Sequence, residues 1–512
     1  MYMKKSMSLL LAGMMFMGMA VTVSAESSEP LKITLYYSDN PTYPFQDDWL
    51  AVTSIEEKYN VELDFEPIPM GDYATKVTNV LTTQGDDTPD IILGSNTKAG
   101  NASLALNGAV YPVSDHPDWT PNFNERAAEF GLESDVEKLK LSDGNLYYLP
   151  ALFDIPFYDG GLILRQDYLE EKGFDAPKNF DDFYEILKAY KEDYPDSFPL
   201  TTIYNAGFLE RMSMPSWGLS LGQANSTATN VLSWDYENKE YFAGAISEQY
   251  KDYVTFLHKL YEEGLLDPEM TQDDASTTQK LATGASMATY GFYDQIGGWE
   301  EASEIEGFDL NMYPPLEGPA GAHHMPKASV ASGILFPMKT SQREDFEEVV
   351  RKVDEIFFSK EAALIWCLGI EGETYTMDGD RIVFSDDILN APEGIYKYMQ
   401  NAYGCGGLTQ TVWVNTREMI KYDENYAALN AEVAAMDDAI QYTPVVPNFD
   451  DLTAEDASLM QTTLGDAFSV WDDAFVRGTK DIEADWDAYV EEMKDKGIDE
   501  FLSLYNEYNK YR

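Results

Sequence analysis

The segment that most resembles a catalytic motif is a serine between two glycines. Residues 218–222 have the sequence Gly-Leu-Ser-Leu-Gly, which fits the G-x-S-x-G turn that exposes a nucleophilic serine between a strand and a helix in hydrolases. No apolar strand precedes this turn, and residues 223–227 are a poor start for a helix. The bases that follow it are His258 and the pair His323 and His324. The sequence therefore argues against a serine hydrolase.

Carboxylates, histidines and cysteines could support other chemistry. Paired carboxylates hydrolyse glycosidic bonds, but among 90 Asp and Glu residues close pairs arise by chance, and no pair is distinguished by its surroundings. The four histidines and two cysteines lack zinc-binding spacing, and no calcium-loop motif occurs. We expect no metal or other cofactor, and a secreted carbohydrate-active enzyme of the glycosidase or lyase type is the alternative function.

Aromatic side chains outside helical stripes are candidates for binding a sugar. Carbohydrate sites combine flat aromatic faces, on which sugar C–H groups stack, with polar groups for the hydroxyls. The candidate faces are Tyr37, Trp217, Tyr290, Tyr293, Trp299 and Trp413, and the candidate polar partners are Asp39, Asn96 and Arg417. Trp217 and Trp299 are preferred, because their glycine neighbours let a ligand approach closely.

The elements predicted near the start of the chain would place three of these candidates at one edge of a sheet. Apolar alternation predicts strands from Leu31 and from Val61 and a doubly buried strand over residues 90–93, separated by helices over residues 47–59 and 73–81. This β-α-β-α-β order favours a parallel, doubly wound α/β sheet, in which ligands bind beyond the carboxyl ends of the strands. Tyr37, Asp39 and Asn96 lie at such ends.

Apolar stripes at helical spacing mark the rest of the chain and are interpreted as core. They are Phe183/Leu187/Tyr190, then stripes within residues 250–261, 346–357, 464–475 and 486–493. Asn179 is expected to cap the first of these helices, and residues 377–380 to form a hairpin turn. Cys367 and Cys405 either pair, as an exported chain permits, or remain buried thiols.

Two breaks in regular structure are expected to carry the chain between two lobes. The first lies at residues 157–161 and the second within residues 314–332. Two crossings, rather than one linker, would produce a hinged cleft. The predicted division assigns residues 26–156 and 330–385 to lobe one, and residues 157–329 and 386–512 to lobe two with its helical C-terminal segment.

The first 25 residues and the net charge bear on location and partners. Lys4 and Lys5 precede an apolar run that ends in Val23-Ser24-Ala25, which is typical of a secretory signal peptide cleaved before Glu26. An N-terminal membrane anchor is the alternative. The formal charge of −55 excludes nucleic acid and anionic membrane surfaces as partners, because phosphates would be repelled.

Several segments together resemble a known family in their order and spacing. They lie within residues 72–92, 145–150, 164–177, 257–269, 369–379 and 486–506. The chain resembles the family 1 extracellular solute-binding proteins of ABC importers, in particular the long branch that includes oligosaccharide binders. The resemblance implies a two-lobe, periplasmic-binding-protein-like α/β architecture that closes on a carbohydrate or oligosaccharide. It also implies delivery of that ligand to the transmembrane subunits of an ABC permease by a monomeric, non-enzymatic protein.

One departure from that family concerns attachment to the cell. Many relatives carry a lipid-attachment cysteine just after the signal peptide, where this chain has Glu26. The resemblance therefore implies an extracytoplasmic protein and leaves periplasmic, secreted and cell-surface locations open. Ligand contacts in the family do not follow a motif, so no site residue is transferred from it.

Overall fold

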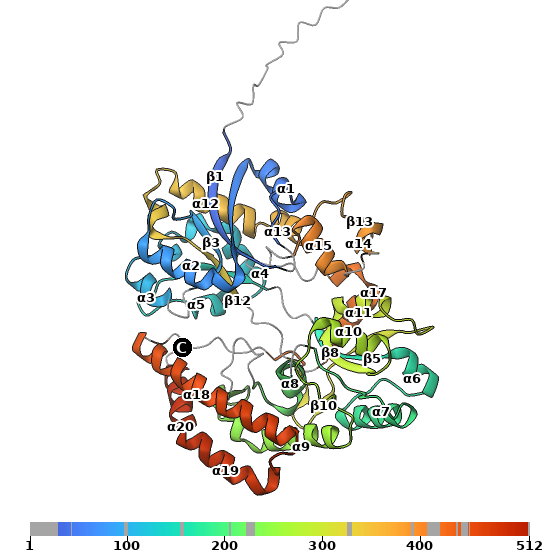
Figure 1. The fold of residues 1–512 in the computed structure, drawn as a ribbon. Coiled ribbons are helices and arrows are strands. Elements are labelled where there is room, and N and C mark those ends of the chain that lie inside the picture. Colours follow the sequence, from blue (N-terminus) through green and yellow to red (C-terminus); the bar gives the residue numbers. More distant parts are fainter. Residues whose placement is uncertain are drawn as a thin grey trace, which may run out of the picture.

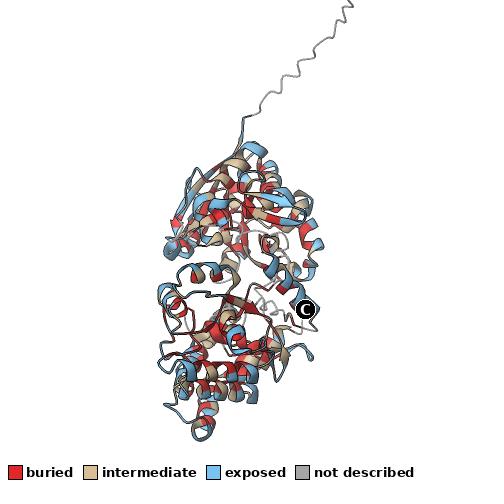
Figure 2. Cartoon of the chain, turned by 90° about the vertical axis from the view of Figure 1, so that its right-hand side faces the viewer, coloured by how far each residue is buried: buried red, intermediate tan, exposed pale blue. Residues whose placement is uncertain are grey.

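Two lobes, each with its own hydrophobic core, make up the described part of the chain (Figure 1). The computed structural model describes residues 29–41, 44–96, 101–153, 158–203, 206–221, 231–324, 330–389, 391, 394–406, 420–436, 439–441, 449 and 451–509. The first core draws on residues 33–153 and 330–405, and the second on residues 158–316 and 429–505. Buried positions gather inside each lobe and exposed ones on its outer faces (Figure 2). The predicted signal peptide lies outside the described residues.

Lobe one is built on a five-stranded sheet with the order β2-β1-β3-β12-β4. Its strands are β1 (Leu31–Asp39), β2 (Val61–Pro69), β3 (Ile91–Ser95), β4 (Tyr148–Leu152) and β12 (Val330–Leu335). β1 pairs in parallel with β2 and β3, and the connections contain α1 (Leu50–Tyr59) and α2 (Met70–Thr83), so the predicted doubly wound unit is confirmed. β12 runs antiparallel to both neighbours because it returns from lobe two.

Further helices and one hairpin complete lobe one. The helices are α3 (Asn101–Leu106), α4 (Pro121–Glu129), α5 (Glu133–Glu137), α12 (Phe346–Phe358), α13 (Lys360–Leu368), α14 (Asp386–Leu389) and α15 (Ile395–Tyr403). Strands β13 (Tyr375–Asp378) and β14 (Arg381–Phe384) form the predicted hairpin, which turns at Gly379 with a positive φ of 65°.

The lobe boundary predicted at residue 385 is wrong, because the chain stays in lobe one beyond it. Ile388, Met399 and Cys405 are buried in the core of lobe one. The Cys405 thiol donates to the carbonyl oxygen of Ile365 at 3.5 Å, which ties this segment to α13. Cys367 and Cys405 both occur as buried thiols and not as a disulfide.

Lobe two contains a smaller antiparallel sheet, β8-β5-β9, surrounded by helices. The strands are β5 (Gly160–Arg165), β8 (Ala288–Phe292) and β9 (Leu310–Tyr313), and two hairpins are β6 (Ser233–Asp235) with β7 (Glu240–Phe242) and β10 (Glu317–Gly318) with β11 (Gly321–Ala322). The helices are α6 (Gln166–Lys172), α7 (Phe180–Asp193), α8 (Ala206–Ser213), α9 (Glu248–Glu262), α10 (Asp274–Ala282), α11 (Ile296–Glu301), α17 (Glu424–Ala435), α18 (Asp451–Val476), α19 (Ile482–Asp495) and α20 (Ile498–Asn509).

Short 3-10 helices punctuate both lobes. They are η1 (Val113–Asp115), η2 (Pro117–Trp119), η3 (Met214–Trp217), η4 (Gly244–Ile246), η5 (Tyr293–Gln295), η6 (Met338–Gln342) and η8 (Ile420–Tyr422). None of the described helices is both long enough and apolar enough to cross a membrane.

The predicted helical stripes are core, as expected. Phe183, Leu187 and Tyr190 of α7 are buried, and the side chain of Asn179 accepts a hydrogen bond from the Asp182 N–H at the start of that helix. α9 contacts α18, and α18 contacts α19 and α20, so the C-terminal helices pack along one side of lobe two (Figure 1).

The crossings between the lobes differ in detail from the prediction. Gly160 and Gly161, expected within the first crossover, begin strand β5 instead. A Cβ on Gly161 would lie 1.6 Å from the phenol oxygen of Tyr158, so only glycine allows this ring to cover the strand. The second crossover, expected within residues 314–332, also contains the β10–β11 hairpin and the start of β12.

Candidate ligand-binding site

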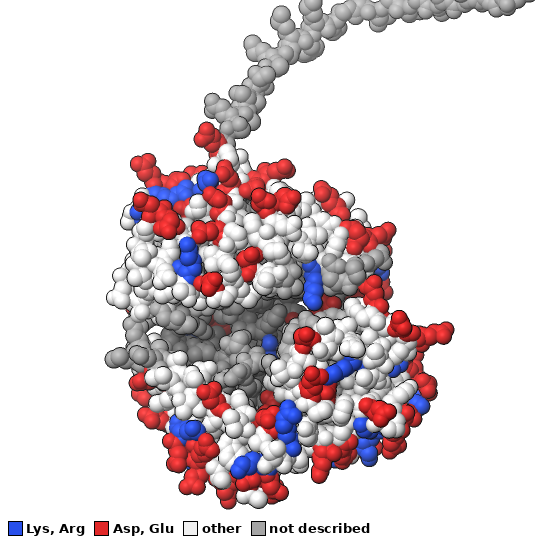
Figure 3. Space-filling model, in the orientation of Figure 1, with Lys and Arg blue, Asp and Glu red and all other residues white. Residues whose placement is uncertain are grey.

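A hollow separates the two lobes (Figure 3). β4 leads out of lobe one and β12 leads back, so the carboxyl ends of β1, β3 and β4 face the second lobe. In lobe two, strand β5 starts at the first crossing from lobe one. Strands β8 and β9 run antiparallel to β5, so their carboxyl ends lie at the same crossing. The ends of both sheets that carry the candidate residues therefore meet at the hollow, where loop side chains can contact a ligand from both lobes.

Asn96 lies at this edge of lobe one, as the sequence predicts. It follows β3, and its Nδ2 donates to the Ser332 hydroxyl of β12 at 2.7 Å. Its carbonyl oxygen accepts from Asn101 Nδ2 at 3.0 Å. Two amides and a hydroxyl thus stand together where the sheet ends, and such groups can bind sugar hydroxyls.

Tyr37 and Asp39 serve local structure in the ligand-free protein. Tyr37 is 4% exposed, and its ring packs on Phe45 and Phe65 with centroids 5.7 and 6.1 Å away. Asp39 accepts a hydrogen bond from the Phe45 N–H at 2.8 Å, which holds the loop after β1. The Tyr37 ring is therefore not open for stacking by a sugar, and one carboxylate oxygen of Asp39 is used by the loop after β1.

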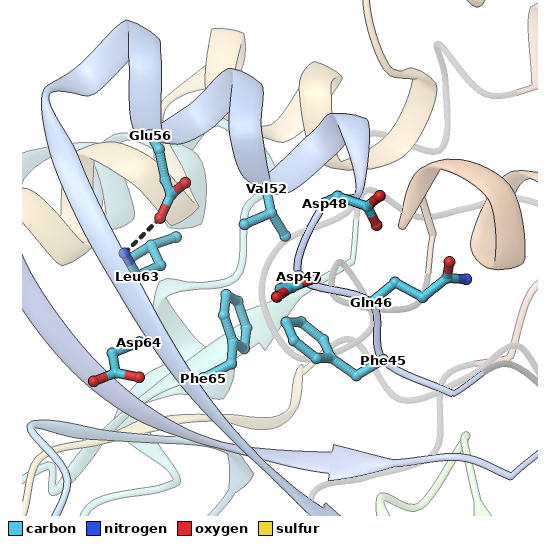
Figure 4. Close-up of a pocket in the computed structure, with 9 residues that line it drawn as sticks. All are labelled: Phe45, Gln46, Asp47, Asp48, Val52, Glu56, Leu63, Asp64 and Phe65. Carbon is cyan, nitrogen blue, oxygen red and sulfur yellow. Dashed lines mark hydrogen bonds between the residues drawn. The ribbon is translucent and has the colours of Figure 1, made fainter.

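A cavity of about 690 Å³ lies beside these residues, along the edge strand β2 (Figure 4). Phe45 and Phe65 form one wall, with ring centroids 4.7 Å apart. The lining also includes Gln46, Asp47, Asp48, Val52, Glu56, Leu63 and Asp64. All of these residues come from lobe one, so closure of the lobes would not enclose a ligand here.

Tyr293 lies at the lobe-two side of the hollow, and Tyr290 does not reach it. Tyr293 follows β8 and stacks on Tyr426 with centroids 4.1 Å apart and planes 13° apart. Burial raises the pKa of the Tyr293 phenol, and the Asp423 carboxylate raises it further. Tyr290 points into lobe two, where it is buried beside Tyr158 and His324.

The two preferred tryptophans pack inside lobe two. Trp299 lies on helix α11, not in an irregular segment, and is 4% exposed. Trp217 has neighbouring rings on several sides, from Phe180, Tyr253 and Phe256 at centroid distances of 5.4, 5.6 and 5.7 Å. Gly218 after Trp217 forms a turn with a φ of 77°, and the glycines before Trp299 lie within helix α11 with open space beside them. Both indoles contact side chains of their own lobe, and neither lies in an open glycine-rich loop.

Trp413 and Arg417, the remaining candidates, lie outside the described residues.

The surroundings of the serine motif differ from those of a hydrolase nucleophile. Ser220 is buried, its N–H donates to the Ser233 hydroxyl at 3.0 Å, and a 3-10 helix precedes the motif where a hydrolase has a strand. Within the part of the chain that the structure describes, no three His, Cys, Asp or Glu side chains are placed to hold a metal ion.

Arg211 is a residue that the sequence analysis missed. It lies on α8, which packs against β5 and β8. Burial lowers the pKa of its guanidinium, and the nearby Asp159 offsets part of that effect. Burial likewise lowers the pKa of the neighbouring His324 to about 4, so this imidazole is neutral at pH 7. The signal available in sequence was a charged pair, Glu210-Arg211, inside an otherwise apolar helix.

Comparison with known proteins agrees with this architecture. A family model described as bacterial extracellular solute-binding protein matches residues 51–342. Lipoprotein LipO of Bacillus subtilis is 26% identical over 391 residues, which cover 73% of this chain and 74% of LipO. The fructooligosaccharide ABC transporter substrate-binding protein FusA of Streptococcus pneumoniae is 23% identical, over 55% of this chain and 52% of FusA. The crystal structure of the alginate-binding protein AlgQ2 has the same fold, with a TM-score of 0.72 at 18% identity over 94% of this chain and 98% of AlgQ2.

Proposed function

Because the chain belongs to the bacterial extracellular solute-binding protein family, we propose that it captures an oligosaccharide outside the cytoplasmic membrane and delivers it to an ABC permease. The observation that carries this proposal is the pair of independent lobes around a hollow, with the loop-bearing ends of both sheets turned toward it. Two walls that can approach each other enclose a ligand and expel its water.

The ligand class is supported by relatives and by side chains at the hollow. FusA is described as a fructooligosaccharide-binding protein and AlgQ2 as an alginate-binding protein. Asn96 and Ser332 supply polar groups from lobe one, and Tyr293 supplies an aromatic group from lobe two. Tyr37, Asp39, Tyr290, Trp217 and Trp299 are left out of the proposed site, because each is occupied by neighbours within its own lobe.

Membership of the family indicates on which side of the membrane the protein works, but not how it is held at the cell. An extracellular solute-binding protein works outside the cytoplasm. We propose that this one is periplasmic, secreted or held at the cell surface, and that it carries no lipid at the predicted cleavage site, since Glu26 stands where lipid-anchored members carry cysteine. Cell fractionation combined with intact-mass measurement of the exported protein tests this, and an added lipid mass would contradict it.

The test of function is a binding panel on the purified mature protein. Calorimetry and thermal shift would be measured with kestose, maltotriose, chitotriose and trigalacturonic acid, each followed by chromatography of the sugar. We expect at least one sugar to raise the melting temperature and to be recovered intact. Consumption of a sugar would favour the enzyme alternative, and absence of binding across the panel would contradict an oligosaccharide carrier.

A further inference from the structure

Arg211 differs from the other described arginines in forming no ion pair with a described carboxylate. Seven arginines lie in the described part of the chain, and six form an ion pair with a carboxylate: Arg126 with Glu125, Arg165 with Asp167, Arg343 with Asp90, Arg351 with Glu347, Arg381 with Glu424 and Arg477 with Asp473. Among the described residues Arg211 has no such pair and no hydrogen-bond partner. In a chain with 90 acidic residues and 35 basic ones, an arginine without an acidic partner is unusual.

Arg211 lies close to the two segments that connect the lobes, where an anionic ligand could take the place of a carboxylate partner. Its two electrostatic neighbours are Asp159, the residue before β5, and His324, the last described residue before β12. These residues belong to the two chain crossings, so Arg211 lies at the base of the hollow on the side of lobe two. α8 lies on the side of lobe two that faces lobe one (Figure 1), and the side chain of Met212, the next residue, packs over Gly160 at the start of β5.

Leaving a guanidinium in this setting costs free energy in the ligand-free protein. A partly buried cation loses hydration, and the loss is offset only when hydrogen-bonded anions replace the water. Burial accordingly lowers the pKa of Arg211, and Asp159 offsets this only in part. His324, held neutral, adds no repelling charge at pH 7 and has a buried Nε2 without a hydrogen-bond partner.

We propose that Arg211 binds the anionic group of an acidic sugar, so that the ligand is a carboxylated or sulfated oligosaccharide. A guanidinium donates two parallel hydrogen bonds to such a group, and this pairing is strong in a site from which water is excluded. The overall negative charge does not prevent it, because surface charges are screened beyond about 8 Å at physiological salt. The inference rests on the proposed function and narrows its ligand class.

The experiment compares sugars that differ only in charge. Calorimetry would be run with trigalacturonic acid, with its fully methyl-esterified form, and with a sulfated and an unsulfated chondroitin disaccharide. The carboxylate and sulfate pairs distinguish the two sources of the anion. We expect one acidic sugar to bind about 30-fold or more tightly than its uncharged or less charged counterpart.

Variants assign the effect to the arginine. Arg211→Gln should reduce the affinity for the acidic sugar by about 30-fold or more and leave the affinity for the methyl ester almost unchanged. Arg211→Lys should retain part of the preference for the acidic sugar, because lysine keeps the positive charge but cannot donate two parallel hydrogen bonds. Arg381→Gln, which removes a surface arginine paired with Glu424, is the matched control and should bind as the wild type does. Unfolding of ligand-free Arg211→Gln should occur at or above the wild-type temperature, since an unpaired charge is removed.

The possible results distinguish failure of this inference from failure of the proposed function. Binding of neutral sugars with no preference for acidic ones, or full retention of that preference in Arg211→Gln, would overturn the inference and leave an oligosaccharide carrier in place. Failure of every neutral and acidic sugar to bind would overturn both.

Discussion

Glu210 is a carboxylic acid enclosed in the core of lobe two. It is 3% exposed, one of its oxygens has no hydrogen-bond partner, and it interacts with Asp472, which also accepts from the Tyr250 hydroxyl at 2.7 Å. Burial raises the pKa of both carboxyl groups, and the Asp472 charge raises that of Glu210 further. The folded protein therefore holds a proton here that the unfolded chain releases near its ordinary carboxyl pKa.

This raised pKa predicts a stability that falls as pH rises. The folded state binds more protons than the unfolded state above the ordinary carboxyl pKa, so unfolding becomes easier from about pH 5 upward. Glu210→Gln keeps a donor toward Asp472 and removes the titration. We expect stability to depend less on pH between pH 5 and 8, and the melting temperature at pH 8 to be about 1–2 °C higher, which corresponds to a stabilisation of about 1 kcal/mol. Exposed Glu262→Gln on α9 is the control, and an unchanged slope in Glu210→Gln would contradict the assignment.

Trp299 is expected to matter for folding rather than for binding. Its indole is buried, and a Cβ on Gly291 would lie 2.8 Å from it, so the ring fills its site closely. Trp299→Ala should lower the free energy of unfolding by about 3–5 kcal/mol, measured in urea, without changing sugar affinity measured on the folded protein. The half-buried Trp119 of lobe one, changed to alanine, should cost clearly less. Loss of sugar binding at wild-type stability would return Trp299 to the binding site.

Strand β12 depends on the absence of a side chain at Gly333. A Cβ there would lie 1.9 Å from the carbonyl oxygen of Leu149 and 2.8 Å from the backbone nitrogen of Ala151, and the pairing with β4 shifts register nearby. Gly333→Ala must push β12 away from β4, and we expect it to destabilise the protein by at least about 2 kcal/mol. Calorimetric unfolding measures the loss.

A glycine in α11 provides the control for that substitution. A Cβ on Gly297 meets no atom within 4 Å, so Gly297→Ala should be neutral or should stabilise the helix by about 0.5–1 kcal/mol. Equal melting temperatures for the two alanine variants would show that β12 relaxes more easily than its contacts indicate.

The molecule as a whole is expected to close like a hinge. The lobes have separate cores and the chain crosses between them, so one lobe can rotate without disturbing the packing of the other. Small-angle scattering should report a smaller radius of gyration with a saturating amount of the tightest sugar of the panel. A sugar that calorimetry shows not to bind is the control, and an unchanged radius despite confirmed binding would contradict closure.

Local patterns were sufficient to predict most elements of this fold. Apolar alternation at Leu31 and Val61, the stripe on α7 and the turn at Gly379 depend on neighbours a few residues apart, so their structure follows from sequence alone. The order of the first strands and helices then requires parallel pairing, because a parallel connection needs an intervening crossover. The polar group at Asn96 was placed correctly for the same reason.

Which side chains face the hollow depended on contacts between distant segments. Gly297 and Gly298 suggested that a ligand could approach Trp299, but a Cβ on either would meet no atom within 4 Å, and the close contact of Trp299 is with Gly291 of β8. The described residues between 386 and 406 belong to lobe one because Ile388 and Met399 are buried in its core, and no local sequence pattern indicates this. Arg211 is distinguished by forming no ion pair with any carboxylate of the described residues, and such an absence can be recognised only from the tertiary structure, because the possible partners come from distant segments.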